Sequence, residues 1–201
     1  RERSIQRFDK MIPGQFVHHY DTQPLGKNMF RIAPDSSVTI SVKVHGTSGI
    51  FSNIKIKVPD DLNIPIKWLS KFINMLYHKY VPFKWQKTKE IYDNIYSSRS
   101  VIKNQYINQG VSSGFYKTDI WGEYNELLKN FIPRGMTVYG EIFGYLTGST
   151  TLIQKDYDYG CAEGTNKFMP YRITTEESDG TKWEWEVSEV LDWTKKLIQI
   201  S

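Results

Sequence analysis

The stretch Thr137-Val138-Tyr139-Gly140-Glu141-Ile142-Phe143 has the two-residue alternation of a β-strand. In a strand, Val138 and Ile142 point to one face, while Tyr139, Glu141 and Phe143 point to the other. The pattern therefore predicts a strand that turns a carboxylate away from its aliphatic side.

Two further segments show the same alternation. Residues 38–42 alternate Val, Ile and Val with Thr and Ser, and this predicts a strand that ends at Lys43. Residues 54–58 alternate Ile, Ile and Val with two lysines. We expect them to form a partner strand, reached through a turn near Gly46 and Gly49.

Apolar residues three and four positions apart predict helices between these strands. One helix spans 66–80 behind Pro65, one spans 121–131 and ends before Pro133 and Gly135, and a last one begins near Ser188. Helices mixed with alternating strands indicate an α+β fold with mostly antiparallel sheets.

The composition excludes several classes of protein. The chain has 201 residues, of which 39% are hydrophobic and 24% charged, as in an ordinary folded domain. Because no run of 18 apolar residues and no signal-like N-terminus occurs, we expect a cytoplasmic protein with no membrane partner. The single cysteine, Cys161, cannot form an internal disulfide, and we expect it to be a small buried residue.

The net charge of +4 is unevenly distributed along the chain. Residues 55–103 carry ten basic and four acidic groups, whereas residues 104–201 carry nine basic and fourteen acidic groups. Lysines interleaved with Trp, Tyr and Phe in the middle segment suit a surface that binds a phosphate backbone and stacks on bases. A solvated helix with its aromatic residues in the core explains the pattern equally well.

The stretch Lys43-Val44-His45-Gly46-Thr47-Ser48 combines a lysine with a glycine three residues later. Glycine lets the backbone turn tightly and approach a ligand, and the hydroxyl residues after it can donate to phosphate oxygens. A lysine attacks phosphorus only when it is partly neutral, which desolvation or a nearby cation can arrange. Taken alone, this stretch fits a surface lysine before a turn better than it fits a nucleophile.

Three later segments favour the interpretation of Lys43 as a nucleophile. Together with Lys43-Val-His45-Gly46-Thr47, the segments 96–100, 138–144 and 168–173 resemble, in order, motifs of the covalent nucleotidyltransferases. This superfamily contains ATP-dependent RNA ligases, DNA ligases and mRNA capping enzymes, and the chain is most similar to the RNA ligase family. The resemblance runs from about residue 38 to 174.

The resemblance implies a nucleotidyltransferase domain whose sheets enclose a nucleotide cleft, with Lys43 as the nucleophile that becomes lysyl-AMP. It implies nucleotide contacts from Val42, His45, Gly46, Arg99, Glu141 and Phe168. Phe168 would stack on adenine, with Tyr171 as the alternative, since the two face opposite sides of a strand. Glu141 would bind the ribose or a metal ion, Mg²⁺ first and Mn²⁺ second.

By the same resemblance, the chain is an ATP-dependent RNA ligase that seals 5′-phosphate and 3′-hydroxyl ends, with RNA favoured over DNA as its partner, and it acts as a monomer. We expect residues 1–201 to form one adenylyltransferase domain that is incomplete at its C-terminus, because the family's last two lysine-containing motifs are not found after residue 174. The basic aromatic segment 59–95 is expected to be a helical insertion.

Three alternatives stay open. The chain could be a DNA ligase, or a capping-type guanylyltransferase that uses GTP. The third alternative is a non-catalytic nucleic-acid-binding module with the same fold, which the missing motifs would allow.

Overall fold

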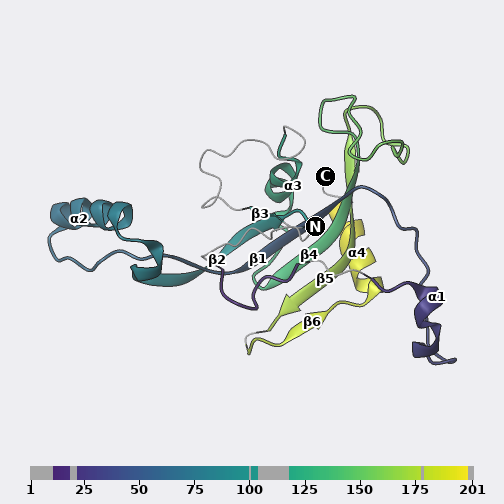
Figure 1. The fold of residues 1–201 in the computed structure, drawn as a ribbon, viewed down its shortest axis with the longest axis horizontal. Helices are drawn as coiled ribbons and strands as arrows, with labels where there is room; N and C mark the ends of the chain where they lie inside the picture. The colour runs from purple at the N-terminus through teal and green to yellow at the C-terminus, as the bar shows by residue number, and fades with distance from the viewer. Residues whose placement is uncertain (1–10, 19–21, 100, 104–117, 178, 199–201) are drawn as a thin grey trace.

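The fold is built around one antiparallel sheet (Figure 1). In the computed structural model, residues 11–18, 22–99, 101–103, 118–177 and 179–198 are described. The strands are β1 (Thr47–Pro59), β2 (Thr88–Ser97), β3 (Ile102–Lys103), β4 (Met136–Gly144), β5 (Asn166–Glu176) and β6 (Lys182–Glu184). They lie in the order β3-β2-β1-β4-β5-β6, and every neighbouring pair is antiparallel.

Four α-helices and two short 3-10 helices accompany the sheet. They are α1 (Leu25–Asn28), η1 (Met29–Arg31), α2 (Lys67–Tyr80), η2 (Phe83–Trp85), α3 (Ile120–Leu128) and α4 (Val187–Ile198). The α+β class expected from the sequence is therefore confirmed, as are the helices over 66–80 and 121–131 and the strands over 54–58 and 137–143.

The main core lies between the sheet and the helices α3 and α4. Val138 and Ile142 of β4 and Phe51 of β1 are buried there, together with Trp121 of α3 and Val190 of α4. Phe51, Val138 and Ile142 lie on the helix-covered face of the sheet, so the residues that alternate with them in β1 and β4 point to the opposite face. Glu141 lies on that opposite face, as its alternation with Ile142 predicts.

A smaller core covers the opposite face near the far end of β1. It contains Ile54, Ile56 and Val58 of β1 and Ile95 of β2, and the N-terminal residues Met11 and Phe16 pack against it. The face that carries Glu141 is thus closed at one end by the N-terminal segment and differs from the helix-covered face.

The β1–β2 ladder extends beyond the sheet as an arm with α2 at its tip (Figure 1). Ten residue pairs join β1 to β2, from Ile50–Ser97 to Pro59–Thr88, while only Thr47–Ser52 of β1 pair with β4. The segment 59–95 was expected to be helical, but its residues 88–95 belong to β2. Ile91 and Ile95 are four residues apart, a spacing that fits one face of a helix and one face of a strand equally well.

The predicted strand over 38–42 is wrong, and so is the turn at Gly46 and Gly49. Residues 38–45 form no ladder, and the side chains of Ile40 and Val42 are 93% and 80% exposed. Gly49 lies within β1, which pairs with β2 and β4 instead. The expectation of several sheets around a cleft is also corrected, because the described residues form a single sheet.

Cys161 is a free, buried cysteine, as expected. None of the described helices is long and apolar enough to cross a bilayer.

Candidate functional site

The site is centred on Glu141, where the start of β1 runs beside β4. Ser48 of β1 pairs with Glu141, and Gly46 lies just before the strand begins. The backbone N–H of Gly46 donates a hydrogen bond to Oε1 of Glu141 at 3.1 Å. The segment before β1 is thereby tied to the carboxylate of β4.

Gly46 is required at this position by close packing. A Cβ atom on Gly46 would lie 2.1 Å from the carbonyl oxygen of Ile142, far inside van der Waals contact. The sequence predicted that this glycine allows a close backbone approach. The approach is made to strand β4, and it brings the residues of the 43–46 segment to Glu141.

Three of the predicted site residues influence the pKa of Glu141. Burial raises the pKa of Glu141, whereas the hydrogen bond from Gly46 and then the charges of His45, Lys43 and Arg99 lower it. Arg99 follows β2 and Lys43 precedes β1, so the chain brings together groups that are 56 positions apart. The structure thus ties Gly46 to this half-buried carboxylate, and Lys43, His45 and Arg99 lie near enough for their charges to act on it.

Tyr171 joins this group through a bulge in β5. The β4–β5 register shifts between Tyr139 and Gly140, which pair with Arg172 and Pro170 and leave Tyr171 as the extra residue. Burial raises the pKa of Tyr171 to about 12; the Ser48 hydroxyl opposes this rise, and the charge of Glu141 adds to it. Tyr171 therefore lies near enough to Glu141 for their charges to interact, while the buried Ser48 Oγ makes no hydrogen bond within the described part of the chain.

Phe168 lies on the other face of the sheet. It pairs with Ile142, and its ring contacts Phe51 edge-on at 5.1 Å and Tyr124 at 5.6 Å between centroids. These neighbours belong to the main core beside α3. Of the two aromatic residues in this motif, the structure brings Tyr171, and not Phe168, to Glu141.

Val42 is 80% exposed, and Lys43 and His45 are also exposed. The segment that carries them is extended coil rather than the end of a strand. Lys43 is therefore held near the site by the hydrogen bond that anchors Gly46 to Glu141. Val42, being mostly exposed, does not line a packed pocket.

A pair of tyrosines, missed by the sequence analysis, holds His45. The backbone N–H of His45 donates to the Tyr159 hydroxyl at 2.7 Å, and the His45 ring meets Tyr157 edge-on at 5.4 Å. Tyr157 and Tyr159 stack at 5.8 Å, and Tyr159 also contacts Phe143 of β4. Two aromatic residues within the polar run Asp156-Tyr-Asp-Tyr-Gly160 were the available signal.

Glu141 is the one carboxylate that the described residues bring to this site as a candidate metal ligand. Among the described residues no group of three or more His, Cys, Asp or Glu side chains could hold a metal. Mg²⁺ in phosphoryl-transfer sites commonly uses one or two carboxylates and takes its other ligands from phosphates and water. Glu141 fits that pattern as a single ligand, and an all-protein metal cage is not formed by the described residues.

Comparison with protein-family profiles, with curated proteins and with solved structures finds no significant match to this chain.

Proposed function

We propose that this chain is the adenylyltransferase domain of an ATP-dependent polynucleotide ligase that acts on RNA. The observation that supports the proposal is the hydrogen bond from Gly46 to Glu141, together with the charges of Lys43, His45 and Arg99 that act on the same carboxyl group. These residues come from three of the four segments that resemble ligase motifs. Scattered surface residues would have no physical reason to meet at one carboxylate.

The proposed chemistry begins at Lys43. Its Nζ attacks the α-phosphorus of ATP, a P–N bond forms, the bond to the bridging oxygen of the β-phosphate breaks, and pyrophosphate leaves while Nζ loses its protons to solvent. A 5′-phosphate oxygen of the polynucleotide then attacks the same phosphorus, and the P–N bond breaks. The 3′-hydroxyl finally attacks the 5′-phosphate, AMP leaves, and the strand is sealed.

The residues around Glu141 supply positioning and charge, which dominate catalysis of phosphoryl transfer. Arg99 offers positive charge to the phosphates, His45 would contact the nucleotide, and Glu141 would hold the ribose or a divalent ion. Bound Mg²⁺ would neutralise charge that develops on the phosphates. Tyr171 is the aromatic residue whose position beside Glu141 suits contact with the base, so we assign it the role first expected of Phe168.

The test is incubation of the protein with Mg²⁺ and ATP labelled at the α-phosphate. After free nucleotide is removed by denaturing gel electrophoresis at neutral to alkaline pH, where a P–N bond survives, we expect label on the wild-type chain and on Lys27→Ala, which changes another exposed lysine. Lys43→Ala and the charge-preserving Lys43→Arg should carry no label. Absence of label from the wild type, or its persistence in Lys43→Ala, contradicts the proposal.

The preference for RNA and for ATP is tested separately. Nicked duplexes that differ only in the 2′-hydroxyls at the nick should be sealed at different rates, and equal rates remove the preference for RNA. Labelling by GTP rather than ATP would indicate a capping-type guanylyltransferase.

The placement of Phe168 favours a second candidate, a nucleic-acid-binding module that does not adenylate itself. Because Phe168 packs into the core, Tyr171 is the aromatic residue that the motif contributes to the Glu141 face. Such a module would bind RNA with unchanged affinity in Lys43→Arg and would give no label in any variant.

A further inference from the structure

The arm formed by β1, α2 and β2 carries most of the basic residues of the segment 55–103. Ser48, the β1 residue opposite Glu141, is eleven residues from Pro59 at the other end of the strand, which is about 36 Å of extended chain. Helix α2 lies beyond that end, at the far side of the molecule from β5 (Figure 1). A surface on α2 is therefore separate from the Glu141 site.

One stripe of α2 is exposed and mixes aromatic with basic residues. Trp68, Phe72 and Met75 are 75%, 54% and 55% exposed. Lys71 and Lys79 are exposed as well. At 100° per residue, about 3.6 residues per turn, these five positions fall on one side of the helix. The main core does not include any residue of α2, so packing in that core does not account for the exposed rings of Trp68 and Phe72.

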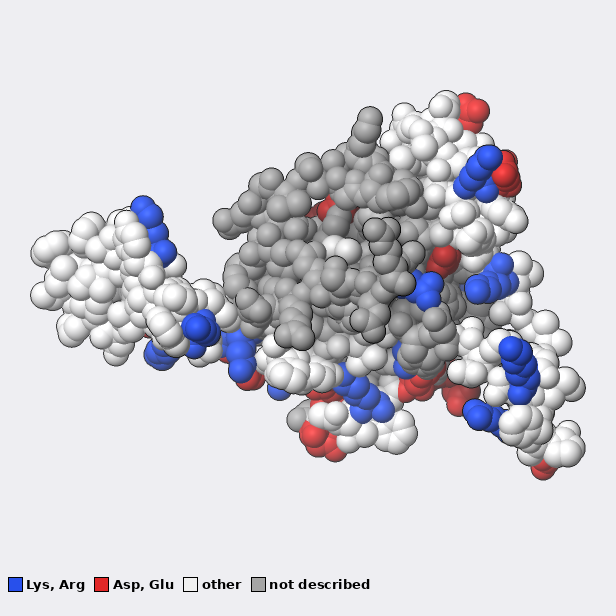
Figure 2. Space-filling view, in the orientation of Figure 1, with Lys and Arg blue, Asp and Glu red and all other residues white. Residues whose placement is uncertain are grey.

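The lysines of this stripe pair with no carboxylate among the described residues, and Lys79 Nζ lies over the Tyr80 ring at 5.2 Å. Helix α2 itself contains no Asp or Glu. By contrast, Lys87 and Lys89 at the base of the arm both pair with Asp60, at 3.0 and 3.3 Å. Figure 2 shows basic side chains along the arm and where it joins the sheet. The arm therefore presents cations that are available to an anionic partner.

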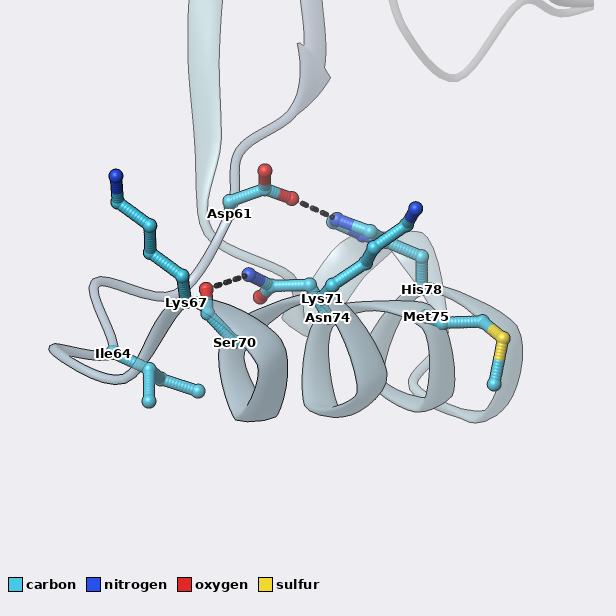
Figure 3. Close-up of a pocket in the computed structure, with 8 residues that line it drawn as sticks. All are labelled: Asp61, Ile64, Lys67, Ser70, Lys71, Asn74, Met75 and His78. Carbon is cyan, nitrogen blue, oxygen red and sulfur yellow. Dashed lines mark hydrogen bonds and ion pairs between the residues drawn. The ribbon is translucent and has the colours of Figure 1, made fainter.

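A hollow of about 460 Å³ adjoins the stripe, between α2 and the segment that leads into it (Figure 3). It is lined by Asp61, Ile64, Lys67, Ser70, Lys71, Asn74, Met75 and His78. Lys71 and Met75 belong to both the hollow and the stripe. Asp61 bonds Nε2 of His78 at 2.9 Å, and Asn74 bonds the backbone of Leu62, so the walls are held by internal contacts.

We propose that this stripe on α2 (Trp68, Lys71, Phe72, Met75 and Lys79) binds a single-stranded polynucleotide, with phosphates at the lysines and bases stacked on the rings. Aromatic rings beside unpaired lysines suit a strand whose bases are free to stack, because every base has a π-face and every linkage a negative charge. A single strand repeats a base and a phosphate at every nucleotide, so it matches rings and lysines that alternate along one stripe. The choice of polynucleotide rests on the proposed function, while the surface itself is independent of the adenylation site.

The first test is the salt dependence of binding to a fluorescently labelled single-stranded oligoribonucleotide, followed by anisotropy. For a single strand, each phosphate contact that is lost should lower the slope of log K against log salt by about 0.7. Lys71→Ala/Lys79→Ala should therefore show a clearly smaller slope than the wild type. Lys195→Ala/Lys196→Ala, which removes the same charge from α4, should keep the wild-type slope.

The second test removes the rings. Trp68→Ala/Phe72→Ala should bind the same oligonucleotide at least about fivefold more weakly, the lower limit for losing one stacked base. The control is Trp183→Ala/Leu191→Ala, which removes two side chains of 60% and 52% exposure from β6 and α4. Unchanged circular dichroism should show that both variants fold.

Labelling of Lys43 by ATP should be unchanged in all four variants. A wild type that gives no label but binds RNA through α2 would end the ligase proposal and leave this one standing. Wild-type protein that does not bind the oligonucleotide, or arm variants that bind as their controls do, would overturn it. A change in oligomeric state with no change in RNA affinity would also overturn it and identify a protein-docking surface instead.

Discussion

Gly46 shows how a single residue positions the proposed nucleophile. Since a Cβ there would lie 2.1 Å from the Ile142 carbonyl oxygen, Gly46→Ala must lift the 43–46 segment away from β4. We expect a loss of about 1–3 kcal/mol in the free energy of unfolding and at least about a tenfold loss of Lys43 labelling. The control is Gly26→Ala, where nothing lies within 4 Å of the new Cβ. Equal labelling in both variants would contradict this role of Gly46.

Glu141 gives a pH dependence whose sign is fixed by its burial. The pKa of Glu141 is raised in the folded chain, so its contribution to stability is greatest below its unfolded pKa and is lost as the pH rises through the folded value. Glu141→Gln removes that titration. We expect this variant to gain more stability relative to wild type at pH 8 than at pH 4, measured by urea unfolding. An equal difference at both values would indicate that burial does not control this carboxyl.

At the scale of elements, periodicity predicts a strand or helix where the pattern also has a packing partner. The alternation over 54–58 becomes part of β1 because β2 pairs with it and the N-terminal segment covers it. The same alternation over 38–42 has no partner strand, and Ile40 is 93% exposed. A local pattern indicates which side chains could share a face of an element. It does not indicate whether another strand or helix packs against that face.

The aromatic motif shows the same limit within the candidate site. Alternation correctly places Phe168 and Tyr171 on opposite faces, but it leaves open which face holds Glu141. That choice depends on pairing with β4 and on the bulge at Tyr171, both of which are long-range. The sequence singles out the 43–46 segment, Arg99 and Glu141 as candidates because each lies in a short recognisable pattern. The Tyr157–Tyr159 pair could not, because only its fold brings it to His45.

The α2 arm depends on a polar contact in place of a core. Asn74 is buried; its Oδ1 accepts from the Leu62 N–H at 2.7 Å, and its Nδ2 donates to the Leu62 carbonyl at 3.3 Å. Asn74→Ala leaves that backbone unsatisfied, so we expect the helix to lose about 1–3 kcal/mol of local stability. Hydrogen exchange should accelerate over residues 61–80 and stay unchanged in β4. Asn63→Ala, at an exposed position, is the control, and equal protection in the two variants would contradict the assignment.

For the whole molecule, the main core and the candidate site share the same two strands on opposite faces. Phe51 is fully buried under α3, and its neighbours in β1 include Ile50, which pairs with Tyr139 on the other side. Phe51→Ala should therefore cost about 3–5 kcal/mol in the free energy of unfolding. Ile40→Ala, in the exposed segment before the site, should stay within about 0.5 kcal/mol of wild type.

Hydrogen exchange distinguishes this shared support from a separately folded site. In Phe51→Ala, protection should fall together in β1, β4 and β5, because the same strands carry the main core and the candidate site. Protection in α2 should change less, since the arm is held by Asn74 and by the β1–β2 ladder beyond β4. If α2 lost protection as much as β4 or more, the arm and the sheet would unfold as one unit. Mutations in the main core would then disturb the polynucleotide surface on α2 together with the Glu141 site.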